Sequence, residues 1–369
     1  MLFKKAIPSE LASGQSVIVV ARWLLVLVGL LVALWHPDPL PQLRVEVAVI
    51  LLVAIVNFVM HAQLLRRRPT LEVVAYAASL GDLLVISLLV AAQGGFGSQV
   101  FVFYFPAFLA IAVAFPTLQA AGLVGIGICL ALVAGPNAPD ATSEALRALS
   151  LAAVAVIGNA YWRLHRAHIQ PGTSARRESA ADLFWGQVAT LWSRWALIVG
   201  STLLVLSRAA TTAELAIGIL PVVVLLGANF YLHGRYLVER PANATLTLLA
   251  SGLDLAMLGV LFMSSPGSAG LGNPYYLFLY PIVFGVGLVF APQVAWPFTA
   301  ASLLLYALMV VPAGLADQGD LKVLVVRLVT LAAVGGLGSL YWRSVRRVNR
   351  ISRQDEAHAG LAWEAAGAS

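Results

Sequence analysis

The stretch Ala269-Gly270-Leu271-Gly272-Asn273-Pro274-Tyr275-Tyr276 joins two long apolar segments, and it has an earlier counterpart, Gly94-Gly95-Phe96-Gly97-Ser98-Gln99-Val100-Phe101. Glycine lets the backbone turn through positive φ angles. Pro274 restricts its own φ and keeps Asn273 extended. Aromatic residues follow both stretches, and such rings commonly lie at a membrane interface. We therefore expect two short connectors between helices, each at a membrane surface.

The composition indicates an integral membrane protein. Of the 369 residues, 60% are hydrophobic and 11% are charged, whereas a soluble domain has about 25% charged residues. The single cysteine, Cys129, lies in an apolar run, which excludes a disulfide framework and a thiolate metal site. The net charge of +6 comes from Lys and Arg at the ends of the apolar runs, so it predicts membrane topology and membrane-lipid contact rather than nucleic-acid binding.

The apolar runs predict an all-α membrane protein with about 12 transmembrane helices, since each run is long enough to cross a bilayer. The fourth and fifth runs of each half are joined by very short links that contain proline, so either pair could instead form a re-entrant hairpin. We expect a first six-helix repeat over 1–164, a cytoplasmic linker over 165–187, a second repeat over 188–343 and a cytoplasmic tail over 344–369. The long first run with Arg22 also argues against a cleavable signal peptide.

The two halves share rare residues at a nearly constant spacing, which predicts an internal duplication. A separation of 172 positions relates Arg22-Trp23 to Arg194-Trp195, Asn57 to Asn229, His61 to His233 and Asp82 to Asp254. Three extra residues enter near the connector, so the separation is 175 for Gly95 with Gly270 and for Pro106 with Pro281. It then becomes 180, as for Arg147 with Arg327 and Tyr161-Trp162-Arg163 with Tyr341-Trp342-Arg343. An even number of spans in each half makes the two repeats parallel.

Positive charge predicts the orientation. Most Lys and Arg residues fall on the side that holds both termini and the linker. By the positive-inside rule this side is cytoplasmic, which predicts a multi-pass protein of the bacterial cytoplasmic (inner) membrane with both termini inside. Both connectors then face the outer side.

Two carboxylates and two arginines are expected inside the membrane. Asp82 and Asp254 fall near the middle of the third span of each half, and a charge at that depth needs a partner. Arg147 and Arg327 lie about 24 Å from the cytoplasmic ends of the sixth spans, and Asp82 lies about 20 Å from its own cytoplasmic end. We predict the ion pairs Asp82–Arg147 and Asp254–Arg327, which either hold span three to span six or polarise a pocket near the connector.

Two histidines are weaker candidates. His61 and His233 each follow an asparagine by four residues on one helical face. They could ligate haem or relay protons, but a hydrogen bond between helices explains them as well. We predict no metal site.

The later connector resembles the Gly-Gly-x-x-Asn-Pro-Phe signature in the membrane domain of RegB/PrrB-type redox-sensor histidine kinases, with Ala269 in place of the first Gly and Tyr275 in place of Phe. That family places the motif between spans three and four and ties it to quinone sensing. The resemblance implies a quinone-like ligand as cofactor. The candidate binding residues are Gly270, Gly272, Asn273, Pro274, Tyr275 and Tyr276, with Gly94 and Gly95 in the earlier copy.

The residues themselves allow two interpretations of the connectors. Flat rings beside a close backbone suit a quinone head group, with Asn273 or a backbone N–H donating to its carbonyl. An ordinary interfacial aromatic belt explains the rings equally well. In the earlier copy the belt is favoured, because Ser98-Gln99 stands where the later copy has Asn-Pro.

Three functions remain open. The resemblance favours a membrane sensor or redox-linked module that binds a quinone or another lipophilic ligand and acts through a cytoplasmic or membrane partner. We expect no enzyme activity from this chain alone, because His358 is followed by Ala359-Gly360 and no nucleotide-binding or nucleophile motif occurs. The alternatives are a secondary transporter of two parallel six-helix halves, and a structural subunit of a respiratory or photosynthetic complex.

Overall fold

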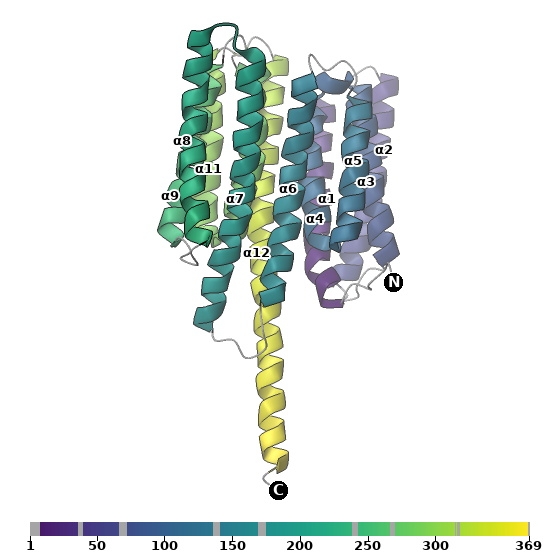
Figure 1. The fold of residues 1–369 in the computed structure, drawn as a ribbon. Helices are drawn as coiled ribbons and strands as arrows, with labels where there is room; N and C mark the ends of the chain where they lie inside the picture. The colour runs from purple at the N-terminus through teal and green to yellow at the C-terminus, as the bar shows by residue number, and fades with distance from the viewer. Residues whose placement is uncertain are drawn as a thin grey trace.

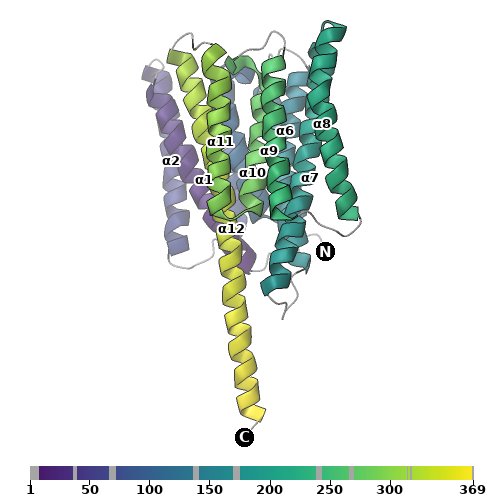
Figure 2. The same ribbon diagram turned by 90° about the vertical axis from the view of Figure 1, so that its left-hand side faces the viewer.

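The computed structural model describes the whole chain except residues 1–7, 36–39, 66–71, 136–140, 169–174, 238–242, 266–269, 314, 316–317 and 368–369. The described residues form α-helices and short 3₁₀ helices, and none of them is in a β-strand. The helices stand side by side in one bundle, from which the last helix projects (Figures 1 and 2). The all-α prediction is confirmed.

The first half contains six α-helices, with two 3₁₀ turns at the first connector. They are α1 (Pro8–Trp35), α2 (Leu40–Leu65), α3 (Glu72–Ala92), η1 (Gly95–Gly97), η2 (Gln99–Phe103), α4 (Tyr104–Ala114), α5 (Thr117–Ala134) and α6 (Ala141–His168).

The second half follows the same order of helices and connector turns, with one additional 3₁₀ turn, η5, before its last helix. It consists of α7 (Ala175–Arg208), α8 (Thr212–Leu237), α9 (Ala244–Ser264), η3 (Gly270–Gly272), η4 (Pro274–Phe278), α10 (Leu279–Val289), α11 (Pro292–Val310), η5 (Val311–Ala313) and α12 (Gln318–Gly367). Helices α6 and α7 therefore extend well into the segment 165–187 that was predicted as a linker.

Ten helices of the described residues are long and apolar enough to cross a membrane, which is the architecture of a multi-pass helical membrane protein. The other two, α4 and α10, have 11 residues each and are too short to cross alone. Each continues a 3₁₀ turn, so that the apolar helical segments are Gln99–Ala114 and Pro274–Val289.

Helices α4 and α10 form the centre of the bundle. Every residue of both helices is buried, as expected for helices that are apolar on all sides. Asn159 of α6 stabilises the end of α4, because its amide donates to the carbonyls of Ala112 (2.9 Å) and Phe115 (3.2 Å). Short helices are tolerated here because protein, not lipid, surrounds their ends.

The two halves meet along α1, α4 and α6 of the first and α7, α10 and α12 of the second. Phe105 of α4 and Tyr280 of α10 stack face to face, with ring centroids 4.0 Å apart and planes inclined by 1°. These residues are equivalent in the predicted duplication, 175 positions apart. The interface between the halves is thus filled by side chains. Within the second half, Gly287 of α10 and Gly338 of α12 bring two backbones together, since a Cβ on Gly287 would lie 3.3 Å from Gly338 Cα.

The bundle has two distinct ends. Helix α1 begins, α6 passes to α7 and α12 leaves the bundle at one end, which we call the linker end (Figure 1). Both glycine connectors lie at the opposite end, the connector end. Helix α12 is 50 residues long and projects far beyond the other helices at the linker end (Figures 1 and 2). The tail predicted from residue 344 onward therefore continues α12 as far as Gly367.

Candidate functional site

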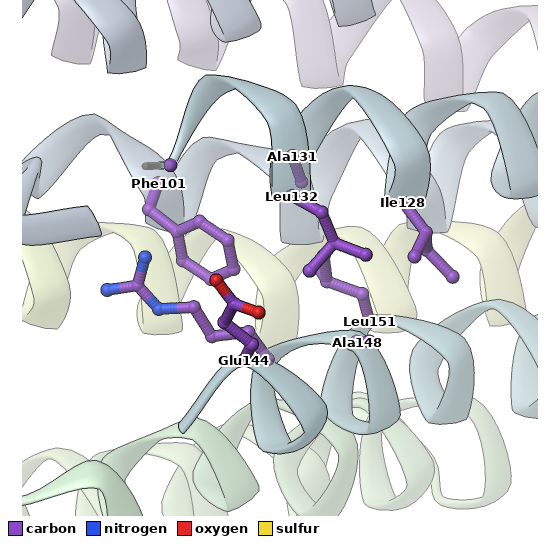
Figure 3. Close-up of a pocket in the computed structure, with 9 residues that line it drawn as sticks. Phe101, Ile128, Ala131, Leu132, Glu144, Ala148 and Leu151 are labelled. Atoms are coloured by element: carbon purple, nitrogen blue, oxygen red, sulfur yellow. The ribbon is translucent and has the colours of Figure 1, made fainter. Parts of the chain in front are cut away.

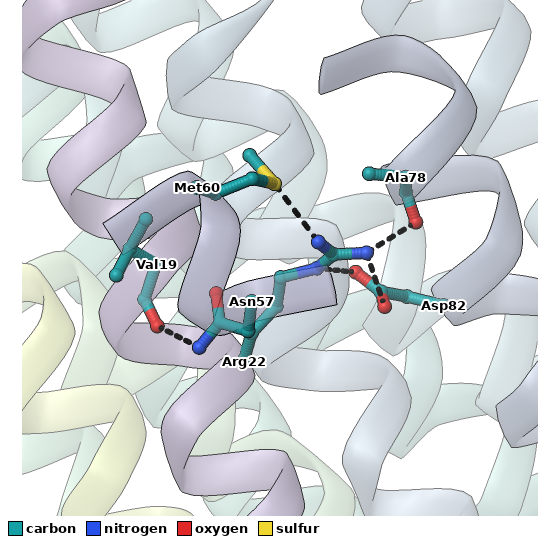
Figure 4. Close-up of polar contacts among 6 residues, drawn as sticks. All are labelled: Val19, Arg22, Asn57, Met60, Ala78 and Asp82. Carbon is teal, nitrogen blue, oxygen red and sulfur yellow. Dashed lines mark hydrogen bonds and ion pairs between the residues drawn. The ribbon is translucent and has the colours of Figure 1, made fainter. Parts of the chain in front are cut away.

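The buried carboxylate of Asp82 pairs with Arg22, not with Arg147. Arg22 of α1 donates from Nε to Asp82 Oδ2 at 2.6 Å and from Nη2 to Asp82 Oδ1 at 2.8 Å (Figure 4). Its remaining donors reach the Ala78 carbonyl (2.7 Å) and Met60 Sδ (3.0 Å). Arg22 and Asp82 are 3% and 7% exposed, so this is a buried bidentate pair.

The second half repeats this pair with fewer contacts. Arg194 of α7 donates from Nε to Asp254 Oδ2 of α9 at 2.6 Å. The predicted pair Asp254–Arg327 is therefore wrong, as is Asp82–Arg147. The error has a physical reason, because depth along a helix says nothing about the lateral position of that helix. The helix of Arg147, α6, packs against α4, α5 and α7, and the helix of Arg327, α12, packs against α1, α10 and α11.

Arg327 lies instead at the connector end, where it holds the second connector. Its Nη1 donates to the Leu271 carbonyl at 2.8 Å and to the Tyr306 hydroxyl at 2.9 Å. Its guanidinium lies 3.7 Å from the centroid of the Tyr276 ring, a cation–π contact. One side chain of α12 thus joins η3, η4 and α11 through a carbonyl, an aromatic ring and a hydroxyl.

Arg147 has a related position in the first half. Its guanidinium lies 4.1 Å from the centroid of the Phe101 ring of η2. Phe101, Glu144 and apolar residues of α5 and α6 surround a small cavity of about 10 Å³ (Figure 3). A cavity of this size holds no more than about one water-sized probe. The arginines of α6 and α12 therefore both contact an aromatic ring of the adjacent connector.

The second connector is tightly packed around Asn273. This side chain is fully buried; its Nδ2 donates to the Phe262 carbonyl at 3.0 Å, and its Oδ1 accepts from Tyr275 N at 3.0 Å. Asn273 is thus the N-cap of η4, with Pro274 as the first residue of that turn. Gly270 is buried and has a φ of +67°, whereas Gly272 is exposed.

Among the described residues of this connector, the rings that suit a quinone head group are packed against protein rather than open. Tyr275 and Tyr276 are 2% and 6% exposed. The cavity that Tyr275 lines with Arg208 and Glu214 has about 20 Å³, far below the roughly 300 Å³ of a small-molecule pocket. Asn273 serves to shape the connector, so the expectation that its amide faces a ligand is corrected: the backbone uses both polar atoms.

The first connector achieves the same shape with other residues. Gly94 and Gly95 have φ angles of +91° and +70°, which a side chain would strain. Ser98 replaces Asn273 as the cap, because its Oγ accepts from Val100 N at 3.2 Å. The loss of Asn-Pro in this copy therefore changes the capping residue but retains the 3₁₀ turn.

His61 has a structural contact. Its Nδ1 accepts from Trp23 Nε1 at 3.0 Å, which supports the hydrogen-bond alternative for this residue. Its neighbour Asn57 donates to the Val19 carbonyl at 3.1 Å rather than to His61 (Figure 4). His233 is half-buried on α8. Within the described part of the chain, no group of three or more His, Cys, Asp or Glu side chains could hold a metal ion.

A groove runs along the first half. It has a volume of about 620 Å³ and lies between α4, α5, α6 and Trp192 of α7. Its lining is apolar except for Thr117 and Asn159. The lining residues are Ala112, Thr117, Ala120, Ala121, Val124, Gly125, Ile128, Ala152, Ala155, Val156, Asn159, Ala160 and Trp192.

Comparison with protein-family models, with curated proteins and with solved structures finds no match. Sequence reasoning missed Arg22, Arg194 and Tyr306, although the pairs Arg22-Trp23 and Arg194-Trp195 were visible as repeated residues. It also missed the groove, whose Ala and Gly residues lie on three separate helices and form no motif.

Proposed function

We propose that this chain is a membrane sensor module that binds a quinone or a similar lipophilic ligand and acts through a partner protein. The observation that carries the proposal is the path of α12. This helix starts at the connector end, where Arg327 holds Leu271, Tyr276 and Tyr306, and continues without interruption to Gly367 outside the bundle.

A rigid helix that is bonded to a connector at one end passes a displacement of that connector to its other end. The connector is filled by its own aromatic side chains, so a flat ligand ring has to displace Tyr276 from the Arg327 guanidinium. Small shifts of a packed helix, about 1–2 Å, are a known form of such switching. The ligand shifts the equilibrium between the packed and the displaced arrangement of the connector only if it binds these two arrangements with different affinities.

The topology belongs to the same proposal. We infer twelve crossings as two parallel six-helix repeats, in which α4 and α10 with their 3₁₀ turns complete the short crossings. Five residues of 3₁₀ helix and 11 of α-helix span about 26 Å, close to the roughly 30 Å of a hydrocarbon core. The arginines near the linker end favour a cytoplasmic location for that end, in a bacterial inner membrane.

A distance measurement between spin labels tests the proposal. We would label Ser352→Cys on the projecting part of α12 and Gly234→Cys on α8, after replacing Cys129 with serine. A short-chain quinone is then added to the protein in lipid nanodiscs, and binding is followed separately by tryptophan fluorescence. We expect the quinone to bind and to shift the label distance by about 1–2 Å.

Arg327→Gln and Arg44→Gln form a matched pair of variants. Arg327 belongs to the projecting helix and contacts Tyr276, so its variant should bind quinone without the shift, while the variant at Arg44, an exposed residue of α2, keeps both. Quinone binding without any shift in the native sequence would contradict transmission through α12. Absence of binding would contradict the sensor proposal as a whole.

Two alternatives have their own measurements. Solute uptake in proteoliposomes would support a transporter, although the stacked Phe105 and Tyr280 fill the interface where such a protein would hold its substrate. Purification with a large redox complex would support a structural subunit, and purification with a kinase or regulator supports the sensor.

A further inference from the structure

The second half carries a tryptophan at the position where the groove of the first half has an alanine. Ala121 and Val156 both line the groove. Their equivalents, at the separations of 175 and 180 positions, are Trp296 and Gly336. The Trp296 ring covers Gly336, since a Cβ built there would lie 3.3 Å from Trp296 Cη2. The indole, which is 47% exposed, thus lies over α12 at the positions that correspond to Ala121 and Val156 in the groove.

The groove opens toward the bilayer. Val156 and Trp192 in its lining are 47% and 55% exposed, and the neighbouring Leu118 is 65% exposed. These residues lie within membrane-crossing helices, so their exposed surface faces lipid. Any molecule that fills the groove has to come from the membrane.

The length of the groove matches one leaflet. Its α5 wall runs from Thr117, at the linker end, to Ile128, which is about 16 Å along a helix. One leaflet contributes about half of the 30 Å hydrocarbon core, or about 15 Å. A hydrocarbon chain of that leaflet therefore has the right length and depth to lie in the groove.

We infer that the groove binds one acyl chain of a phospholipid from the leaflet at the linker end, and that this chain supplies the packing that Trp296 supplies in the second half. Apolar cavities of protein interiors take up apolar guests. The inference is independent of the proposed function, because it requires neither a quinone nor a movement of α12.

The lining favours a chain over a flat ring. Most of its residues are Ala, Gly, Val and Ile, and Trp192 is its only aromatic residue, whereas pockets for ring-shaped ligands usually combine several aromatic walls. No charged side chain lines the groove, so the charged head group stays outside it, at the membrane surface near Thr117.

Native mass spectrometry of the purified protein tests the inference. The protein is reconstituted with a single synthetic phospholipid, extracted into mild detergent and measured for retained lipid. We expect one phospholipid per chain in the native protein. The double variant Ala121→Trp/Val156→Gly copies the second half into the first, and it should lower the retained fraction at least tenfold.

The reverse exchange gives the opposite expectation. Trp296→Ala/Gly336→Val opens the second half, and the number of retained phospholipids should rise from one to two. Gly125→Leu is a further filling variant with little steric cost, because nothing lies within 4 Å of a Cβ at Gly125. Leu88→Trp, on the exposed face of α3, is the control and should leave retention unchanged.

Three results would overturn the inference. The filling variants could fold with an unchanged melting temperature and still retain the lipid. The native protein could retain none. Finally, protein purified from native membranes could carry an isoprenoid quinone in the groove, with binding abolished by Ala121→Trp/Val156→Gly. A failure of the label-distance experiment would not affect any of these outcomes.

Discussion

Removal of the Asp82 carboxylate should destabilise the protein far more than a surface substitution does. In Asp82→Ala the Arg22 guanidinium loses both of its carboxylate bonds, at 2.6 and 2.8 Å, and stays buried at 3% exposure. Charges about 4 Å apart at an effective dielectric constant of about 20 attract by about 4 kcal/mol. Breaking one partner of a buried pair costs about 3–5 kcal/mol. We expect a loss of this size in the free energy of unfolding.

A double-mutant cycle decides which arginine is the partner. Unfolding is measured by circular dichroism during SDS titration in mixed micelles, for Asp82→Ala, Arg22→Ala and the double variant. We expect a coupling energy of about 2 kcal/mol or more for this pair. The same cycle with Arg147→Ala should give additive effects, within about 0.5 kcal/mol, because the two residues share no contact.

The second half offers an internal comparison. Only one hydrogen bond joins Arg194 to Asp254, so Asp254→Ala should cost less than Asp82→Ala. The reasoning would be refuted by a coupling of Asp82 to Arg147 that exceeds its coupling to Arg22. A loss of only about 0.6 kcal/mol in the free energy of unfolding of Asp82→Ala, the average for polar contacts between membrane helices, would contradict the expected loss of about 3–5 kcal/mol.

Two further predictions concern the second connector and the contact between α10 and α12. Asn273→Ala should lower the free energy of unfolding by about 2–3 kcal/mol, because it removes both a cap and the bond to the buried Phe262 carbonyl. Asn243→Ala removes an exposed cap of α9 and should lower it by only about 1 kcal/mol. Equal losses for the two variants would contradict the role of Asn273. Gly287→Ala should cost about 1–3 kcal/mol in the same assay, since its Cβ would meet the Gly338 backbone at 3.3 Å. A Cβ at Gly252 would have nothing within 4 Å, so Gly252→Ala should leave the free energy of unfolding unchanged or raise it. Equal effects of Gly287→Ala and Gly252→Ala would show that α10 and α12 can move apart.

The membrane architecture could be predicted from local composition. Long apolar runs have to become helices in a bilayer, because only helices satisfy their own backbone groups there. The same argument explains why α4 and α10 remained uncertain. Their 16-residue apolar segments fall below the length of an independent crossing, and only the surrounding protein makes such a length acceptable.

The connector motif predicted a turn correctly and its surroundings incorrectly. Asn273 and Pro274 do form the start of a 3₁₀ turn, as their local preferences require. Whether the rings after them leave a cavity depends on α9, α11 and α12, which are distant in sequence. Arg327 closes the connector from 51 positions beyond Tyr276, and no local pattern announces that contact.

The sequence by itself determined what each segment must be: apolar helices, two glycine-rich turns and buried charges in need of partners. Tertiary structure alone decided which groups meet, as Arg22 with Asp82, and where space is left, as beside Ala121. The physical reason is that helix formation and burial depend on residues a few positions apart. Pairing and cavities depend instead on the lateral order of helices, which is set by the sum of many weak packing contacts across the whole bundle.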